Sequence, residues 1–164
     1  MVEQPGDLIQ LDTMELRPLP GVVRHHVTAV DLVSRSSVAA VRSAASAGPA
    51  RAFLDQVATR LPAPIRALQV DGGSEFMAEF EAACQQRKIR LVVLPPRSPK
   101  LKGIVERTNR TDRSEFSECY AGDLALPALQ AALAAFEQTY NHVRPHQALG
   151  YRTPAAALAA SAHV

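Results

Sequence analysis

The stretch PPRSPKLKGIVERTNR, residues 95–110, is the part of the chain from which the fold and function are best read. Its single acid, Glu106, lies among five basic residues, which are Arg97, Lys100, Lys102, Arg107 and Arg110. This combination suits a phosphate-containing ligand that is bound together with a metal ion. The carboxylate can bind the metal ion, and the basic residues can bind the phosphate. A metal site of this kind needs two more acids, which must come from elsewhere in the chain.

Basic residues are concentrated around this stretch. Between residues 87 and 113 there are nine Lys or Arg against two acids, although the net charge of the 164-residue chain is only +2. One face of the protein should therefore be basic. The chain is only 5% aromatic and has no base-reading motif, so we expect these residues to contact mainly phosphates.

The composition predicts one compact domain, because 164 residues with 47% hydrophobic content can form a single core. Cys84 and Cys119 lie in apolar helical patterns without a CxxC or Cys/His cluster, so neither a disulfide framework nor a zinc site is predicted. No apolar run approaches the roughly 20 residues of a membrane span, and the N-terminus does not have the form of a signal peptide. We expect a cytoplasmic protein with no membrane partner and no small-molecule substrate.

The apolar pattern predicts five strands, at residues 8–16, 22–32, 37–41, 65–70 and 90–94. Short turns join the first three, which should form an antiparallel meander. A helix at residues 50–61 and a second helix carrying Phe76 and Phe80 separate the later strands, which implies parallel pairing with right-handed crossovers. The predicted fold class is α/β, with a five-stranded mixed sheet, an antiparallel meander plus two parallel strands, flanked by helices.

A further helix is predicted from Gly103. At about 100° per residue, its polar face carries Glu106, Arg110, Arg113 and Ser117, and its apolar face carries Ile104, Val105, Thr108, Phe116 and Cys119. Asp112 and Glu115 interrupt the apolar face, so the second half of this helix should bend or be exposed. A helical tail follows from about residue 123.

Three acids are candidates for the metal site. Asp12 lies in the middle of the first strand, Asp71 ends the fourth, and Glu106 lies near the start of a helix. They can converge only if the first and fourth strands are neighbours. Two divalent ions about 3.5–4 Å apart can clamp the attacking and leaving oxygens of a phosphodiester, and three carboxylates suffice to hold such a pair.

Four motifs occur in order along the chain: GDLIQLDT around Asp12, LPAPIRALQVDGGSEF around Asp71, PRSPKLKGIVERTNRT around Glu106, and YNHVRPHQALGYRTP near the end. With these motifs, and with 34 residues between Asp71 and Glu106, the sequence resembles the integrase core domain of DDE transposases and retroviral-type integrases, in particular the bacterial insertion-sequence branch. The resemblance covers essentially the whole chain.

This resemblance implies a ribonuclease H-like fold and a pair of Mg²⁺ or Mn²⁺ ions on Asp12, Asp71 and Glu106. It implies DNA cleavage and strand transfer without a covalent enzyme intermediate, with transposon ends and target DNA as partners, and a homodimer or larger assembly. Its basic residues four and seven positions after the Glu match Arg110 and Arg113.

The resemblance further implies that residues 1–164 are a single catalytic core domain, acting in the bacterial cytoplasm on the nucleoid. The DNA-binding domain that usually precedes this core is expected to be absent. Two positions depart from the family pattern, because Gly72 and Lys102 stand where asparagine is common.

Two alternative functions follow from the same residues. Gly72 and Lys102 leave open a catalytically impaired DNA-binding or assembly module, and the shared fold leaves open a ribonuclease H-type nuclease.

Other polar residues have structural interpretations. Asp31, in a turn, is expected to form hydrogen bonds. His25 and His26 face opposite sides of a strand, and Pro145 separates His142 from His146, so neither pair predicts a metal site. Tyr140, Asn141, Arg144 and His146 are expected to brace the site, with contact to DNA as the alternative, and Glu75 to lie at a helix start or near DNA.

Overall fold

The computed structural model describes residues 2–44, 47–76, 78–95 and 102–161. The strands are β1 (Ile9–Leu19), β2 (Val22–Asp31), β3 (Ser37–Arg42), β4 (Ala67–Val70) and β5 (Arg90–Val93). The α-helices are α1 (Ala47–Arg60), α2 (Glu79–Gln86), α3 (Gly103–Thr111), α4 (Leu126–His142) and α5 (Pro154–Ser161). Short 3-10 turns occur at Ser74–Phe76 and Gln147–Leu149, and a π-helical turn at Asp112–Ser117 follows α3 directly.

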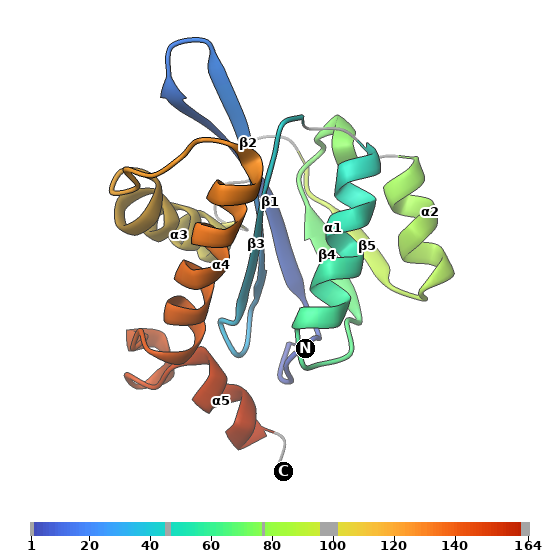
Figure 1. The fold of residues 1–164 in the computed structure, drawn as a ribbon. Helices are drawn as coiled ribbons and strands as arrows, with labels where there is room; N and C mark the ends of the chain where they lie inside the picture. The colour runs from blue at the N-terminus through green and yellow to red at the C-terminus, as the bar shows by residue number, and fades with distance from the viewer. Residues whose placement is uncertain (1, 45–46, 77, 96–101, 162–164) are drawn as a thin grey trace.

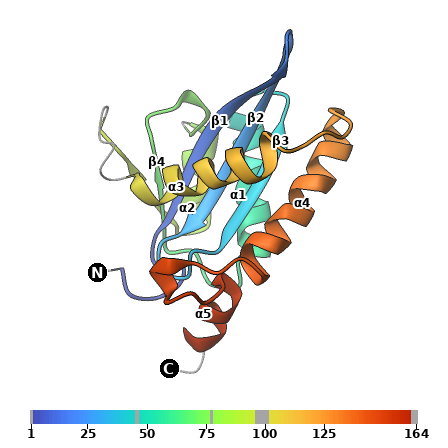
Figure 2. The ribbon, with the colours of Figure 1, turned by 90° about the vertical axis from the view of Figure 1, so that its left-hand side faces the viewer.

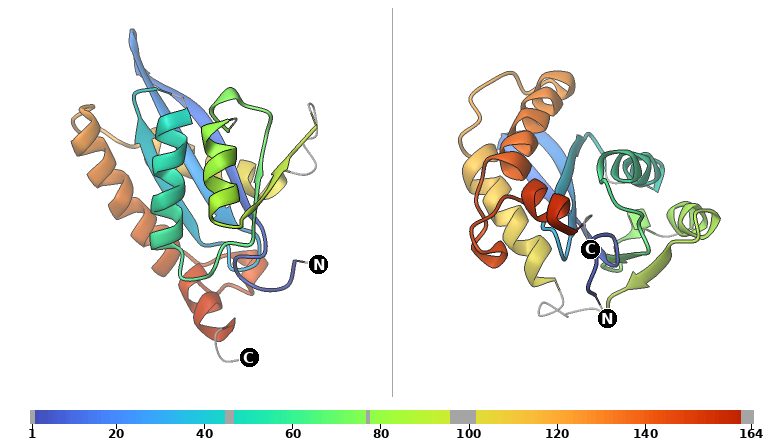
Figure 3. Two further views of the ribbon diagram at one scale, coloured as in Figure 1. Left: turned by 90° about the vertical axis from the view of Figure 1, so that its right-hand side faces the viewer. Right: turned by 90° about the horizontal axis from the view of Figure 1, so that it is seen from below.

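The strands form one mixed sheet in the order β3-β2-β1-β4-β5. Its β1–β2 and β2–β3 pairs are antiparallel, and its β1–β4 and β4–β5 pairs are parallel. Figures 1 and 3 show α1 and α2 covering one face, while α3 and α4 cover the other, where α3 crosses the strands (Figure 2). The predicted meander with a parallel half is confirmed, as is the expected neighbourhood of the first and fourth strands.

Alternation along β1 divides its side chains between the two helical layers. Ile9 and Leu11 are buried in the larger core, against α1 and α2. Gln10 and Asp12 therefore point to the opposite face, toward α3. A smaller cluster on that face joins β3, the π-helical turn and α4; its buried members are Ala39, Val41, Phe116, Leu129 and Leu133.

The helix expected to carry Phe76 begins later than predicted. Phe76 ends a 3-10 turn, and α2 starts only at Glu79. The rings of Phe76 and Phe80 still pack edge to face, with their centroids 5.2 Å apart, and both are buried. The apolar pattern was therefore interpreted correctly as a buried face, but not as one continuous helix.

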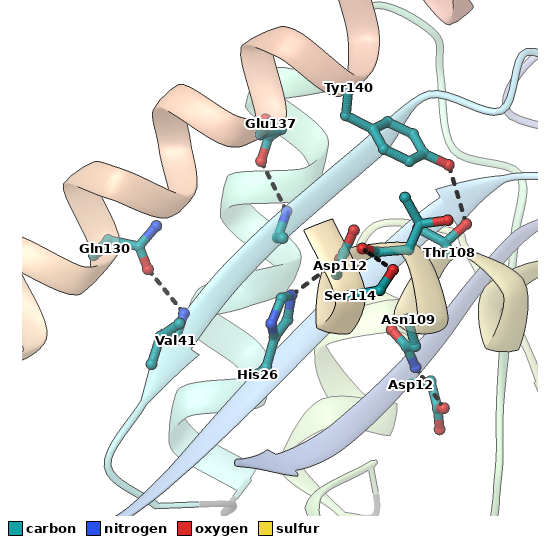
Figure 4. A network of polar contacts seen from close by, with 12 residues as sticks. Asp12, His26, Val41, Thr108, Asn109, Asp112, Ser114, Gln130, Glu137 and Tyr140 are labelled. Atoms are coloured by element: carbon teal, nitrogen blue, oxygen red, sulfur yellow. Dashed lines mark hydrogen bonds and ion pairs between the residues drawn. The ribbon is translucent and has the colours of Figure 1, made fainter. Parts of the chain in front are cut away.

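Helix α4 covers the open edge of the sheet at β3. Three alternate residues of β3 present backbone N–H groups along this edge, and side chains of α4 accept hydrogen bonds from these groups. Ser37 donates to Asn141 Oδ1 (2.9 Å), Ala39 to Glu137 Oε2 (2.8 Å) and Val41 to Gln130 Oε1 (2.8 Å), and the last of these bonds is drawn in Figure 4. Arg60 also forms an ion pair with Glu137. The edge strand is thereby closed to pairing with another strand.

Strands β1 and β2 continue past their neighbours as a projecting hairpin (Figure 1). The last β1 residue paired with β4 is Gln10, and the first β2 residue paired with β3 is His25. Leu19, near the turn, is 54% exposed. In the described part of the chain, no helix is both long and apolar enough to cross a membrane.

Replacing Glu137 with Ala should lower the free energy of unfolding by about 1–3 kcal/mol, because the buried Ala39 N–H loses its acceptor. Urea denaturation followed by circular dichroism measures this. Glu137→Gln retains an acceptor oxygen and should lose less, and Glu81→Ala, at an exposed position of α2, is the control. Equal stability of Glu137→Ala and the unmodified protein would contradict the proposed docking of α4.

Candidate functional site

The parallel register of β1 and β4 brings Asp12 and Asp71 together. The two strands pair at Ile9 with Leu68 and at Gln10 with Gln69. Asp12 lies two residues beyond Gln10, and Asp71 lies two residues beyond Gln69, so the two acids continue the same register. Because side chains alternate every residue and neighbouring strands lie about 4.8 Å apart, both carboxylates point to one face, side by side.

The Lys102 ammonium lies between these carboxylates. Its Nζ is 3.1 Å from Asp12 Oδ1 and 2.7 Å from Asp71 Oδ2. The side chains of Lys102 and Asp12 are each 16% exposed, and that of Asp71 is 45% exposed. Lys102 immediately precedes α3, so the start of this helix is fixed to the interior of β1 and to the end of β4. Two acids from different strands thus share one cation.

This shared cation does not fully neutralise the pair. Burial raises the pKa of the Asp12 carboxyl, and the charge of Lys102 opposes that rise. Burial also lowers the pKa of the Lys102 ammonium, but the hydrogen bond to Asp71 and the charge of Asp12 outweigh it, so the net shift is upward. The pKa of Asp12 rises because burial outweighs the neighbouring ammonium, and that of Lys102 rises because its contacts with the two carboxylates outweigh burial. The contact thus places two carboxylates against one ammonium.

Side chains of α3 and β1 hold Asp12 in position. Asn109 Nδ2 donates to Asp12 Oδ2 over 2.9 Å (Figure 4), which leaves Oδ1 for Lys102. The backbone N–H of Val105 donates to Gln10 Oε1 over 3.1 Å, and this contact ties the first turn of α3 to β1. Thr108, on the same helix, contacts the Tyr140 hydroxyl at 3.2 Å. Helix α3 is thus fixed both to the sheet and to α4.

Glu106 lies on the exposed side of α3 and faces the same open cavity as Asp12. An open cavity of about 280 Å³ is lined by Asp12, Met14, Glu106, Asn109, Arg110 and Arg113. The helical face predicted from the sequence is confirmed, since Glu106, Arg110 and Arg113 are exposed while Val105 and Thr108 are buried. Among the described residues, no group of three Asp, Glu, His or Cys side chains is close enough to hold one metal ion. Asp12 and Asp71 are brought together, with Glu106 beside the first of them.

A buried contact between a histidine and an aspartate lies beneath the C-terminal end of α3. His26 Nε2 is 3.2 Å from Asp112 Oδ2, and both side chains are almost fully buried (Figure 4). Asp112 begins the π-helical turn, whose extra residue rotates everything that follows relative to α3. Cys119 was expected on the buried face but is exposed, because the helical segment ends at Ser117, before this residue. The second half of the predicted helix is this π-helical turn, in which Glu115 is exposed and Asp112 is buried.

The remaining predicted residues fall into four groups. Asp31 has the structural role expected of it, and it accepts hydrogen bonds from Gly6 N, Val33 N, Ser34 N and Ser34 Oγ. The residues expected to brace the site make structural contacts, because Asn141 bonds to Ser37, Arg144 pairs with Glu115, and the His146 and Tyr140 rings lie 4.7 Å apart. Arg97 and Lys100 lie outside the described residues, as does the side chain of Glu75. Arg107 lines a different cavity, on the other side of α3.

Sequence reasoning missed the contacts that support the acids. Lys102 was predicted to bind DNA, whereas the structure gives its ammonium to Asp12 and Asp71. Asn109 was not singled out, although its position three residues after Glu106 places it on an adjoining side of the helix. His26 and Asp112 carried no sequence signal as a pair, because their contact joins segments far apart in the chain.

Comparisons with known proteins agree on one family. The model of the integrase core domain matches residues 2–99, and a second integrase core domain model matches residues 87–154. The insertion element IS476 uncharacterized 39.2 kDa protein of Xanthomonas euvesicatoria is 33% identical over 138 residues, which are 82% of this chain and 39% of that protein. The chain therefore spans about two fifths of the length of this relative.

Two solved structures share the fold. A chain of the simian T-cell lymphotropic virus intasome in complex with PP2A regulatory subunit B56 gamma aligns with a TM-score of 0.82 and 22% identity, over 94% of this chain and 55% of that chain. The catalytic core domain of BIV integrase aligns with a TM-score of 0.72 and 24% identity, over 96% of this chain and 97% of that chain. These likenesses confirm the expected ribonuclease H-like fold. Since one family model matches more than half of its length, the chain belongs to the integrase core domain family.

Proposed function

We propose that the chain is the catalytic core of a DDE-type polynucleotidyl transferase that cleaves DNA and joins its ends, as a bacterial insertion-sequence transposase does. The observation that carries this proposal is the placement of Asp12 and Asp71 around one cation position, at the point where β1 and β4 separate. Glu106 lies beside Asp12, on the exposed face of the adjoining helix. Membership of the integrase core family supports the same activity.

The donor set suits divalent metal ions. Asp12 and Asp71 offer hard oxygen ligands, which Mg²⁺ and Mn²⁺ prefer, and they already hold a cation between them. Asp12, Asp71 and Glu106 would hold the pair of ions. When bound, the ions would increase the nucleophilicity of a water or 3′-hydroxyl and stabilise the charge of the phosphoryl transition state. Asp12 and Asp71 fit that role as they lie, Glu106 would complete the set by moving closer to them, and an ion must first displace the Lys102 ammonium.

The protein's own residues would position the DNA. Arg110 and Arg113 are exposed on the Glu106 side of α3, where they can hold the phosphate under attack by charge-assisted hydrogen bonds. Asn109 keeps Asp12 in one orientation through its 2.9 Å bond. In the reaction a water or 3′-hydroxyl oxygen loses its proton and bonds to phosphorus, while the bond to the leaving 3′-oxygen breaks. No covalent link to the protein forms.

The proposed partners are transposon ends and target DNA, bound by a dimer or a larger assembly of this chain in the bacterial cytoplasm, on the nucleoid. Arg97, Lys100, Lys102 and Arg107 remain candidates for DNA contact outside the Arg110 and Arg113 pair. Family membership favours this catalytic interpretation over an impaired assembly module or a ribonuclease H-type nuclease.

The first test replaces Glu106 with Gln. Metal-dependent nicking and joining of a DNA duplex carrying the element's ends should fall at least a hundredfold, because a carboxylate ligand is lost while the side chain keeps its shape. DNA affinity measured by fluorescence anisotropy should stay within about twofold. Glu118→Gln, at another exposed position on the chain, is the matched control and should retain activity. Joining that survives in Glu106→Gln would exclude the proposed mechanism.

The second test replaces Lys102 with Met. Without metal, the variant should lose about 1 kcal/mol of unfolding free energy, as is typical of partly exposed ion pairs, because Asp12 and Asp71 then repel each other. Its affinity for Mn²⁺, measured by isothermal titration calorimetry, should rise by about fivefold, since the ion no longer displaces an ammonium. Lys102→Arg keeps the positive charge and is the control. Unchanged or weaker Mn²⁺ binding in Lys102→Met would show that Lys102 does not occupy the metal position.

A further inference from the structure

A second cavity lies on the opposite side of α3 from Glu106. It measures about 920 Å³ and is bounded by α3, by the turn after β2 and by the chain that follows α4. Arg35, Arg107, Arg144 and His146 line it, and no Asp or Glu side chain does so among the described residues. The cavity is therefore basic as well as large, and helix α3 forms the ridge between it and the site around Glu106.

Among the described residues, two of these arginines form no ion pair. Arg144 forms a bidentate pair with Glu115, so its charge is balanced. In the same part of the chain, Arg107 forms no ion pair, and the buried Nε of Arg35 has no hydrogen-bond partner. The Asp31 carboxylate acts on Arg35 through its charge, but it accepts its hydrogen bonds from Gly6, Val33 and Ser34. A buried guanidinium N–H without a partner is unfavourable unless a ligand supplies one.

The Arg35 guanidinium is also electrostatically strained. Burial lowers its pKa and the nearby positive charge of Arg107 lowers it further, while Tyr140 and Asp31 partly oppose the shift. Two cations without ion-pair partners at the wall of one cavity suit an anion that both can reach. An arginine offers several N–H donors in a fork that matches the oxygens of phosphate.

Backbone strain occurs at the same cavity. Four non-glycine residues in the described chain have a positive φ, and two of them, Arg35 (62°) and Tyr151 (63°), line this cavity. Such conformations are unfavourable and persist where the surrounding structure enforces them, often at ligand sites. Two backbone hydrogen bonds hold these positive φ values in place. Arg35 N donates to Asp31 O (3.0 Å), and Tyr151 N donates to His146 O (2.9 Å). The cavity wall is therefore fixed before any ligand binds.

We infer that this cavity binds a backbone phosphate of DNA between Arg35 and Arg107, at a position separate from the phosphate under attack. The inference rests on the proposed function, because the ligand is a phosphodiester of the same DNA. A helix with its side chains is about 10–12 Å across. DNA crossing α3 would therefore place in this cavity a phosphate a few nucleotides from the scissile one.

The salt dependence of DNA binding tests the site. Fluorescence anisotropy with a labelled duplex should show that Arg35→Ala lowers the slope of log K against log salt by about 0.9, the contribution of one phosphate. Arg107→Ala should have the same effect, and the double variant should lose one phosphate rather than two, because both arginines hold the same group. Arg51→Ala, exposed on α1 across the sheet, is the matched control, and Arg35→Lys should retain part of the slope.

A second measurement keeps the test independent of DNA and of folding defects. In the NMR spectrum of the unmodified protein, the Arg35 Nε–H signal should shift and saturate with millimolar inorganic phosphate, but not with chloride at equal ionic strength. Saturation by phosphate alone, without any effect of Arg35→Ala on DNA binding, would assign the cavity to a free anion and overturn the proposed DNA contact. Unchanged slopes in stably folded Arg35→Ala and Arg107→Ala would do the same.

The position of the phosphate can be located directly. In one duplex, a neutral methylphosphonate replaces a phosphate two to four nucleotides from the scissile position. The unmodified protein should bind this duplex more weakly than the unsubstituted one. The Arg35→Ala variant should bind both duplexes with equal affinity. Equal weakening of both proteins at each position would overturn the inference. None of these binding results depends on Glu106. The phosphate site can therefore be disproved while the joining activity is confirmed, and the joining activity can be disproved while the phosphate site is confirmed.

Discussion

The parallel pairing of β1 with β4 is the constraint on which the rest of the molecule depends. Only two residue pairs define it, Ile9 with Leu68 and Gln10 with Gln69, yet a shift of one residue would turn Asp12 and Asp71 to opposite faces of the sheet. The buried side chains of β1 and β4 protect this register, because Ile9, Leu11 and Leu68 all belong to the core on the other face. Hydrophobic packing on one side of the sheet thus fixes carboxylate geometry on the other.

Helix α3 converts that geometry into a site with two sides. Gln10 binds its first turn, Asn109 contacts Asp12 from its middle, and the buried His26–Asp112 pair anchors the π-helical turn at its end. With both ends fixed, the exposed side of the helix directs Glu106, Arg110 and Arg113 into one cavity, while Arg107 turns toward another. The chain after α4 completes the second cavity, which gives the YNHVRPHQALGY segment a role beyond packing.

The strands and the orientation of α3 could be predicted from sequence, because they depend on local periodicity and on connection lengths. The five strands and the face carrying Glu106 follow from such patterns, whereas the neighbouring positions of β1 and β4 were expected only because the three acids have to converge. The π-helical turn could not be predicted, since no local pattern marks an inserted residue, and the end of the helical segment at Ser117 left Cys119 assigned to the wrong face. Likewise, the contacts of Lys102 with Asp12 and of His26 with Asp112 depend on tertiary placement, which a sequence pattern does not contain.

The projecting hairpin of β1 and β2 affects solubility. Toward the turn, β1 has no pairing with β4 beyond Gln10, and β2 has no pairing with β3 before His25. Such free outer edges can template aggregation. The segment contains deterrents to strand addition, because Pro18 has no N–H to donate, and Arg17 and Glu15 form a charged pair 2.6 Å apart. The molecule can therefore extend a ribbon into solvent without offering an edge for uncontrolled self-association.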